Sequence, residues 1–138
     1  MIVIDASVWV SRLMLDDAFH EVSRAWMGEV VEAGEILVAP IILLAEVAGA
    51  IARRTGDPRL GHQSVQQIRQ VPTLQIIDID NSLGDYAAQV ASDLRLRGAD
   101  ATYVAVADRF DIPLVTWDQE LLDRAGAVIL VQMPEQPA

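Results

Sequence analysis

Five short apolar runs, separated by segments long enough for helices, constrain the fold of this chain more than any other feature. The runs are MIVID (1–5), EILVA (35–39), LQIIDI (74–79), PLVTW (113–117) and AVILV (127–131). Strands that are apolar throughout are typical of parallel sheets, whose strands are joined by helical crossovers and covered on both faces. The pattern therefore predicts an α/β fold with a mainly parallel central sheet. At 138 residues we expect one domain, 1–132, followed by a frayed tail, 133–138.

The segments between these runs predict helices over 6–15, 16–34, 41–54, 60–70, 81–98, 100–110 and 118–126. Pro40 is expected to stop the second strand, and Asn81 or Ser82 to cap the helix that ends at Gly98. The apolar stretch 36–52 is nearly long enough to span a bilayer. Pro40 and Glu46 interrupt it, so we interpret it as a strand, a turn and a buried helix, and expect no membrane partner.

Composition excludes several classes of function. The net charge is −10, with no lysine, which argues against broad nucleic-acid binding but not against binding through a local basic face. The absence of cysteine excludes disulfides, thiolate zinc sites and a cysteine nucleophile. It is compatible with a cytoplasmic protein, as is an N-terminus without the layout of a signal peptide. His20 and His62 lie in no ligand pattern and are interpreted as surface residues.

Four carboxylates do not fit the pattern of a solvated surface. Asp5 and Asp118 each follow an apolar strand, Glu46 interrupts a strongly apolar helix, and Asp100 opens a helix. In a parallel sheet, side chains at the carboxyl ends of strands lie along one edge, where ligands bind. Each aspartate could instead cap its helix. Glu46 is harder to explain in this way, because a buried unpaired carboxylate is costly; Arg12 is a candidate partner.

Taken together, the four acids suggest one metal site. Clustered carboxylates repel one another, and some would be protonated unless a cation joined them. A site of oxygen ligands without histidine or cysteine favours Mg²⁺ or Mn²⁺, and such a site suits phosphodiester hydrolysis by a bound water. A phosphoryl-accepting enzyme is disfavoured, because the chain has no lysine. A binding module whose acids only cap helices does not explain Glu46.

Four segments, taken in order, resemble the PIN-domain family, and within it the VapC-type toxins of prokaryotic toxin–antitoxin pairs. They are VIDASVWV, LLAEVAGA, RGADATYVAVA and LVTWD, and the resemblance covers essentially the whole chain. It implies a three-layer α/β/α sandwich and a metal-dependent endoribonuclease that uses Mg²⁺ or Mn²⁺. The catalytic and metal-binding positions that it implies are Asp5, Glu46, Asp100 and Asp118. Ser7 and Thr116 match small polar positions beside them, although Ser7 could equally make a local cap.

The resemblance also implies partners: an RNA substrate, a cognate antitoxin and a second copy of the chain in a homodimer. An apolar set on the first two helices could line a partner groove or simply pack the core. Its members are Trp9, Leu13, Met14, Trp26 and Met27. A housekeeping RNA-processing nuclease of the same family is the alternative function.

Arginine would have to supply any cationic contact with RNA, since there is no lysine. One group lies within 53–69, and a second immediately precedes Asp100. The two groups are Arg53, Arg54, Arg59 and Arg69, and Arg95 and Arg97. Arginine holds phosphate and stacks on bases, but such residues also occur on ordinary solvated surfaces with ion pairs. Of these, Arg95 and Arg97 are the predicted RNA contacts.

Overall fold

The computed structural model describes residues 1–135 and contains a five-stranded sheet in the order β3-β2-β1-β4-β5. Its strands are β1 (Ile2–Ile4), β2 (Leu37–Pro40), β3 (Leu74–Ile77), β4 (Leu114–Val115) and β5 (Val131–Gln132). All four neighbouring pairs are parallel, and the central strand places Val3 beside Val38 of β2 and Leu114 of β4. The predicted parallel sheet is confirmed.

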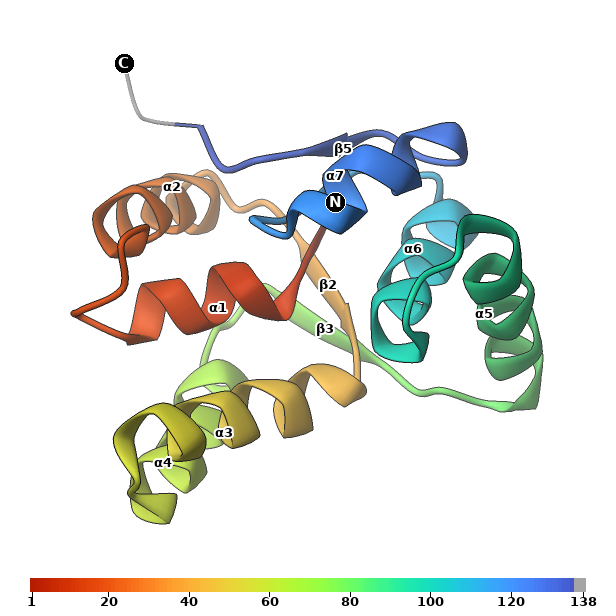
Figure 1. Cartoon of the computed structure of the whole chain (residues 1–138). Helices are drawn as coiled ribbons and strands as arrows, with labels where there is room; N and C mark the ends of the chain where they lie inside the picture. The colour runs from red at the N-terminus through yellow and green to blue at the C-terminus, as the bar shows by residue number, and fades with distance from the viewer. Residues whose placement is uncertain (136–138) are drawn as a thin grey trace.

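Helices cover the sheet on both sides (Figure 1). They are α1 (Ala6–Leu13), α2 (His20–Glu32), α3 (Ile42–Thr55), α4 (Pro58–Arg69), α5 (Asn81–Leu94), α6 (Gly98–Phe110) and α7 (Gln119–Arg124), with a 3₁₀ turn at Ala125–Ala127. In Figure 1, α1 to α4 lie on one side of the strands, and α5 and α6 lie on the other. This is the α/β/α sandwich expected from the sequence.

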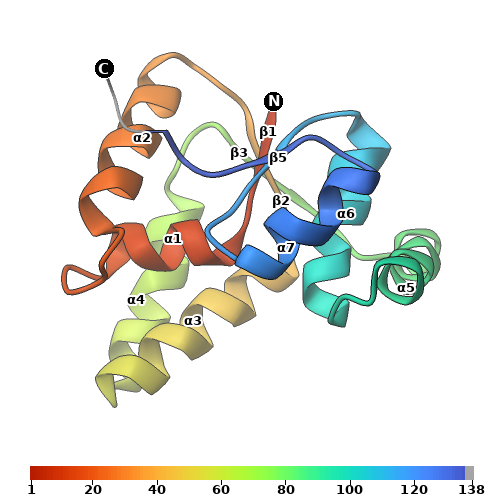
Figure 2. The ribbon, with the colours of Figure 1, turned by 45° about the horizontal axis from the view of Figure 1, so that its top comes forward.

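The first turns of α1, α3, α6 and α7 gather at one end of the sheet (Figure 2). Each of α1, α3 and α7 follows the carboxyl end of a strand, as parallel topology requires. Helix α6 is not preceded by a strand. It reaches the same end because it packs lengthwise against the sheet and is buried continuously from Asp100 to Ala107. This end of the sheet therefore collects side chains from four separate segments.

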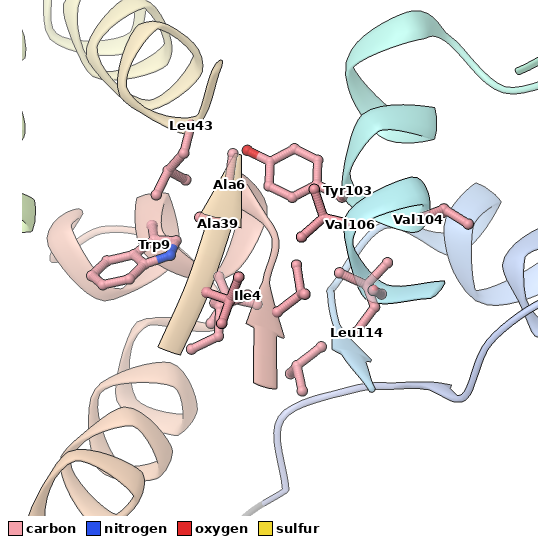
Figure 3. Close-up of a cluster of buried hydrophobic side chains, with 14 of the residues drawn as sticks. Ile4, Ala6, Trp9, Ala39, Leu43, Tyr103, Val104, Val106 and Leu114 are labelled. Carbon is pink, nitrogen blue, oxygen red and sulfur yellow. The ribbon is translucent and has the colours of Figure 1, made fainter. Parts of the chain in front are cut away.

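The core lies on both faces of β1 and β2. Figure 3 shows Trp9 and Leu43 on one side, and Tyr103 and Val106 of α6 on the other. Trp9, Trp26 and Met27 are buried in this core, while Leu13 and Met14 are partly buried against it. The core interpretation of this apolar set is therefore correct for its two tryptophans and Met27. No helix within residues 1–135 has both the length and the apolar character needed to cross a bilayer.

Several boundaries differ from those expected. Pro40 is the last residue of β2, opposite Ile77, and does not stop the strand before it. The next residue, Ile41, donates its N–H to the Ile77 carbonyl (2.9 Å), so the ladder continues past the proline that cannot donate. Helix α4 begins two residues early, at Pro58, because Asp57 caps it.

The α5–α6 connection also differs from the expected one. Asp80, not Asn81 or Ser82, caps α5, by accepting the Leu83 N–H at 2.8 Å. The helix ends at Leu94 because Arg95 adopts a left-handed conformation (φ 55°), which turns Leu96 into the core. Gly98, expected to end this helix, is instead the first residue of α6.

The second helix begins at His20 instead of residue 16, after a turn in which Asp17 accepts the Phe19 N–H at 2.9 Å. His20 is buried, and its Nδ1 bonds to the Ser11 carbonyl oxygen at 3.0 Å, so the surface interpretation of this histidine is wrong. His62 is exposed, as expected. Of the tail expected to fray, 133–135 form neither helix nor strand, and 136–138 lie outside the described residues.

Close packing of α3 on α4 depends on Gly61. A Cβ at this position would lie 2.7 Å from the Ala48 carbonyl oxygen, so Gly61→Ala must push the two helices apart. We expect a net loss of about 1–2 kcal/mol of unfolding free energy, since overpacking outweighs the better helix propensity of alanine. Urea unfolding measures the change.

Gly84→Ala is the matched control, because a Cβ at Gly84 in α5 meets nothing within 4 Å. It should raise the unfolding free energy by about 0.5–1 kcal/mol through helix propensity alone. Equal effects of the two substitutions would contradict the close α3–α4 approach.

Candidate active site

Asp5 lies where β1 ends and α1 begins. Its backbone N–H donates to the Val115 carbonyl (3.0 Å), which fixes it beside the end of β4. Its Oδ2 accepts hydrogen bonds from Ser7 Oγ (2.7 Å), Thr116 Oγ1 (2.9 Å) and the Ser7 N–H (3.3 Å). Asp5 thus caps α1, as one interpretation predicted, yet all of these bonds go to one carboxylate oxygen. Burial raises the pKa of Asp5, and the bonds from Ser7 and Thr116 oppose that shift.

Asp118 occupies the equivalent position after β4. Its Oδ1 accepts the N–H groups of Glu120 (2.8 Å) and Leu121 (3.3 Å), so it caps α7. Thr116 Oγ1 accepts the Asp118 N–H at 2.9 Å while it donates to Asp5. One threonine hydroxyl therefore ties the two strand-end aspartates together.

Glu46 reaches the same end of the sheet from α3. The phenol of Tyr103, on α6, donates to Glu46 Oε1 at 2.7 Å. Burial raises the pKa of Glu46, the Tyr103 hydrogen bond lowers it, and the Asp5 charge raises it further. Within residues 1–135 Arg12, the candidate partner of Glu46, forms no ion pair, and the phenol of Tyr103 is the donor to Glu46 instead.

Sequence reasoning missed Tyr103. A signal was present, because Tyr103 stands in the mostly apolar run ATYVAVA of a helix, and a buried phenol needs a hydrogen-bond partner. In Figure 3 its oxygen points toward Ala6, at the start of α1.

Asp100 lies in the first turn of α6 and does not cap it. The N-cap position is Arg97, without a side-chain capping bond. Asp100 Oδ2 is buried and has no hydrogen-bond partner among residues 1–135; the nearest cationic atom is Arg97 Nε, at 3.6 Å. Burial, followed by the charges of Asp5 and Asp118, raises the pKa of Asp100 to about 6, against the opposing charge of Arg97. The capping interpretation is therefore wrong for this residue.

A cavity of about 270 Å³ brings the acids together. It is lined by Asp5, Ala6, Ser7, Glu46, Arg97, Ala99, Asp100 and Asp118. Thr116 is fully buried beneath Asp5. Arg97 therefore adjoins the acids, whereas Arg95 is the left-handed residue after α5, and its carbonyl accepts a bond from Arg124 Nη1 (2.6 Å).

The acids are near one another but do not form a closed ligand set. Within residues 1–135 no three acidic or histidine side chains converge tightly enough to enclose an ion. Three of the acids direct one oxygen to protein donors, namely Asp5 Oδ2, Glu46 Oε1 and Asp118 Oδ1. Asp100 Oδ2 is buried without a donor. Oxygen-only donors that face a common cavity fit Mg²⁺ or Mn²⁺, since Mg²⁺ needs only one or two carboxylates and keeps several waters.

The model of the PIN domain family matches residues 2–127. The chain belongs to the PIN domain family. Solved structures share the fold of this PIN domain at low identity. VapC20 of Mycobacterium tuberculosis, a toxin that cleaves the sarcin–ricin loop, superposes with a TM-score of 0.75 at 20% identity, over 99% of this chain and 100% of that one.

Two further solved structures are similar. VapBC2 of Rickettsia felis, bound to promoter DNA, gives a TM-score of 0.73 at 13% identity, over 98% of this chain and 100% of that one. FitAcB of Neisseria gonorrhoeae gives a TM-score of 0.72 at 20% identity, over 97% of this chain and 98% of that one. A search of curated proteins finds no match to this PIN domain.

Asp100→Asn should make the metal-free PIN domain more stable at pH 7.5. The folded-state pKa of about 6 exceeds the ordinary 3.8, so the folded chain binds this proton more tightly than the unfolded chain. The stabilisation from the protonated group is complete below pH 3.8 and is lost as the pH rises through 6. Two pKa units set an upper limit of about 3 kcal/mol, and solvent at the cavity reduces the expected gain to about 1–2 kcal/mol.

Urea unfolding in chelator at pH 7.5 and near pH 4 measures this effect, which should nearly vanish at the lower pH. The exposed Asp93→Asn variant is the control and should show no such dependence. Added Mg²⁺ should stabilise the wild type more than Asp100→Asn, by mass action. If Asp100→Asn raised the free energy of unfolding equally at both pH values, burial would not be what raises the pKa of Asp100.

Tyr103→Phe keeps the buried ring and removes the donor to Glu46. Because that hydrogen bond lowers the pKa of Glu46, we expect the pKa to rise, and about 1 kcal/mol of stability to be lost. Carboxyl NMR titration of Glu46 measures the shift. Tyr86→Phe, which removes a phenol that donates to Asp108 on the surface instead, should leave the Glu46 titration unchanged. An unshifted Glu46 in Tyr103→Phe would show that the phenol does not set its ionisation.

Proposed function

We propose that this PIN domain is a metal-dependent endoribonuclease, and that it is the toxin of a toxin–antitoxin pair that inhibits translation or growth in the cytoplasm. One observation carries the proposal. Carboxylates from α3, from α6 and from the N-cap positions of α1 and α7 line one cavity, and one of them has a buried oxygen without a donor. Such a cluster repels itself, and a divalent cation with a phosphodiester substrate would relieve that repulsion.

Each acid can be assigned a task in this reaction. Bound Mg²⁺ or Mn²⁺ would activate a water and offset the phosphate charge. Asp5 and Asp118 keep one oxygen fixed by protein donors, and so orient the other toward the cavity contents. Glu46, whose Oε1 accepts the Tyr103 hydroxyl, does the same from α3. Asp100 lines the same cavity and has a carboxylate oxygen without a protein donor, so that oxygen is available to the cation.

Arg97 extends from the same cavity with an exposed guanidinium, 3.6 Å from Asp100. It can therefore bind a phosphate of the RNA strand without leaving the site. Ser7 and Thr116 act by orienting Asp5, through its Oδ2. Arg95 remains a proposed RNA contact outside the cavity lining.

The partners are proposed from relatives of the same fold. VapC20 is described as a toxin that cleaves the sarcin–ricin loop, and a further similar structure is a toxin–antitoxin complex from Klebsiella pneumoniae, at 17% identity and a TM-score of 0.68. By analogy we propose a cognate antitoxin and a homodimer for this chain. A housekeeping RNA-processing nuclease would use the same site, whereas a binding module would gain nothing from four costly acids at one cavity.

Cleavage of a mixed, largely unstructured RNA with Mg²⁺ or Mn²⁺ tests the enzyme. Asp5→Asn, Glu46→Gln and Asp100→Asn should each lower turnover by about 100-fold or more, as removal of a metal ligand or a base commonly does. Chelator should abolish cleavage by the wild type. Asp93→Asn removes an equal charge from an exposed position and should cleave normally. Unchanged turnover in any of the three variants would remove that acid from the site.

Growth of a bacterial host separates the toxin from the housekeeping nuclease. Expression of the wild type should arrest growth, Asp100→Asn should not, and the product of an adjacent reading frame should relieve the arrest. Cleavage in vitro without any growth arrest would favour the housekeeping function.

A further inference from the structure

A second cavity, of about 410 Å³, adjoins the acidic one. The two share Ala6, Ser7, Glu46 and Asp118 as lining residues. The remainder of the second lining has a different character, since it is aromatic, aliphatic and cationic. These residues are Val10, Phe19, Ala50, Arg53, Arg54 and Trp117, together with Asp17, which is paired with Arg54. The hydrolytic chemistry does not require this surface, so its composition needs another explanation.

Two aromatic rings form one wall of this cavity. Phe19 and Trp117 are stacked, with ring centroids 4.1 Å apart and an interplanar angle of 8°. Phe19 remains 44% exposed although it is a large apolar side chain. Because both rings line the cavity and Phe19 is not buried, part of the aromatic surface of the pair is accessible to an occupant of the cavity.

The aromatic wall is rigidly connected to the acids. Trp117 stands between Thr116 and Asp118, and its backbone N–H donates to Ser7 Oγ at 3.0 Å. Its ring Nε1 donates to Ser23 Oγ at 2.8 Å, and the Ser23 hydroxyl is paired with Ser11 Oγ at 2.6 Å. Ser11 and Ser23 are buried. Hydrogen bonds therefore fix both the backbone and the ring of Trp117 relative to the acidic cavity.

The cationic side of the cavity has one uncompensated charge. Arg54 Nη1 pairs with Asp17 Oδ2 at 2.9 Å, and Asp17 also accepts the Phe19 N–H. Arg53 forms no ion pair in the part of the chain that the structure describes. Its Nη1 lies 3.3 Å from where a Cβ of Gly49 would be, so the guanidinium lies back along α3. An anion at the cavity would find Arg53 available.

We propose that this cavity is a nucleobase subsite for the RNA strand whose phosphodiester lies at the acids. An unstacked base would lie against the Phe19–Trp117 wall, and Arg53 would bind the adjoining phosphate. The inference rests on the proposed function and adds a specificity-determining surface to it. An aromatic wall can stack against any base, and a cation complements the negative charge of the RNA backbone. Because the two cavities share lining residues, one RNA strand can occupy both.

The assignment predicts which RNA is accepted. A base inside a duplex cannot reach an aromatic wall in a cavity, so the subsite selects loops, bulges and single strands. A protein segment is the competing occupant. It would use the same apolar area but has no need of an unpaired cation beside a metal site.

Fluorescence anisotropy with a labelled, short single-stranded RNA in chelator tests the subsite without any turnover. Phe19→Ala should weaken binding by about 5–150-fold, the loss expected for one stacked base, and Phe19→Tyr should restore it. Phe110→Ala removes a comparably exposed ring, 40% exposed, that does not line this cavity and should bind as the wild type does. RNA should also quench the tryptophan emission of the wild type, and Trp117→Phe should lose that quenching.

Arg53 is tested by salt dependence. Arg53→Ala should weaken RNA binding and reduce the slope of log K against log salt by about 0.7, the value for one single-strand phosphate contact. Arg53→Lys should restore the slope because it keeps the charge. Arg69→Ala, at an exposed position on α4, is the control. In cleavage assays, Phe19→Ala and Arg53→Ala should raise KM and leave kcat nearly unchanged.

The outcomes separate this inference from the proposed function. If the wild type cleaves RNA while Phe19→Ala matches Phe110→Ala in affinity and KM, the subsite is refuted and the nuclease stands. If Phe19→Ala weakens only the antitoxin complex, the wall binds protein and the inference is wrong. If no RNA is cleaved but quenching and the Phe19 effect persist, the subsite stands and the proposed reaction falls.

Discussion

The hydroxyl of Thr116 is the contact on which the rest of the site depends. It donates to Asp5 Oδ2 and accepts the Asp118 N–H, so it joins the ends of β1 and β4 at the level of the side chains. Backbone pairing alone would place the two aspartates at one edge, but it would not orient either carboxylate. Together with Ser7, this hydroxyl also offsets the free-energy cost of burying the Asp5 carboxylate. Without these hydrogen bonds, the buried Asp5 would be more easily protonated. The same short segment, Thr116 to Asp118, carries Trp117 and so fixes the aromatic wall at the same time.

Three acids of the site are costly to ionise in the free chain. Burial raises the pKa values of Asp5, Glu46 and Asp100, so each is costly to ionise in the folded state. Helix α6 offsets part of this cost in two ways. Its residues from Asp100 to Ala107 are buried in the core, and its Tyr103 donates a hydrogen bond to Glu46. Holding carboxylates close together lowers the free energy of unfolding unless a bound cation offsets their repulsion. Such a cost is usual for a preorganised site. The well-packed sheet and α6 supply the rigidity that such a site needs.

The pattern of apolar residues was enough to predict the sheet and the positions of the two strand-end acids. Contacts that depend on tertiary geometry were not predicted. Asp5 and Asp118 could be placed together because parallel strands end at one edge, and Glu46 was recognisable because it breaks an apolar helix. The partner of Glu46 was not predictable, since Tyr103 lies 57 residues away on another element. The end of α5 was missed because Arg95, not a glycine, takes the left-handed position. The Phe19–Trp117 wall was missed for a related reason, because the turn before α2 that presents Phe19 has no helical or strand periodicity.

An acidic chain can still bind an anionic strand, because net charge acts at long range and recognition is local. The net charge is −10, and several carboxylates pair with arginines, as in the contacts of Arg24, Arg54, Arg59 and Arg124. Those arginines add little attraction for RNA, because each is compensated by a neighbour. Attraction would come from a cation at the acids, from Arg97 at the same cavity and from Arg53 beside the aromatic wall. Few phosphate contacts imply a weak dependence of affinity on salt, so base stacking and the metal, rather than a basic surface, would determine which RNA such a site accepts.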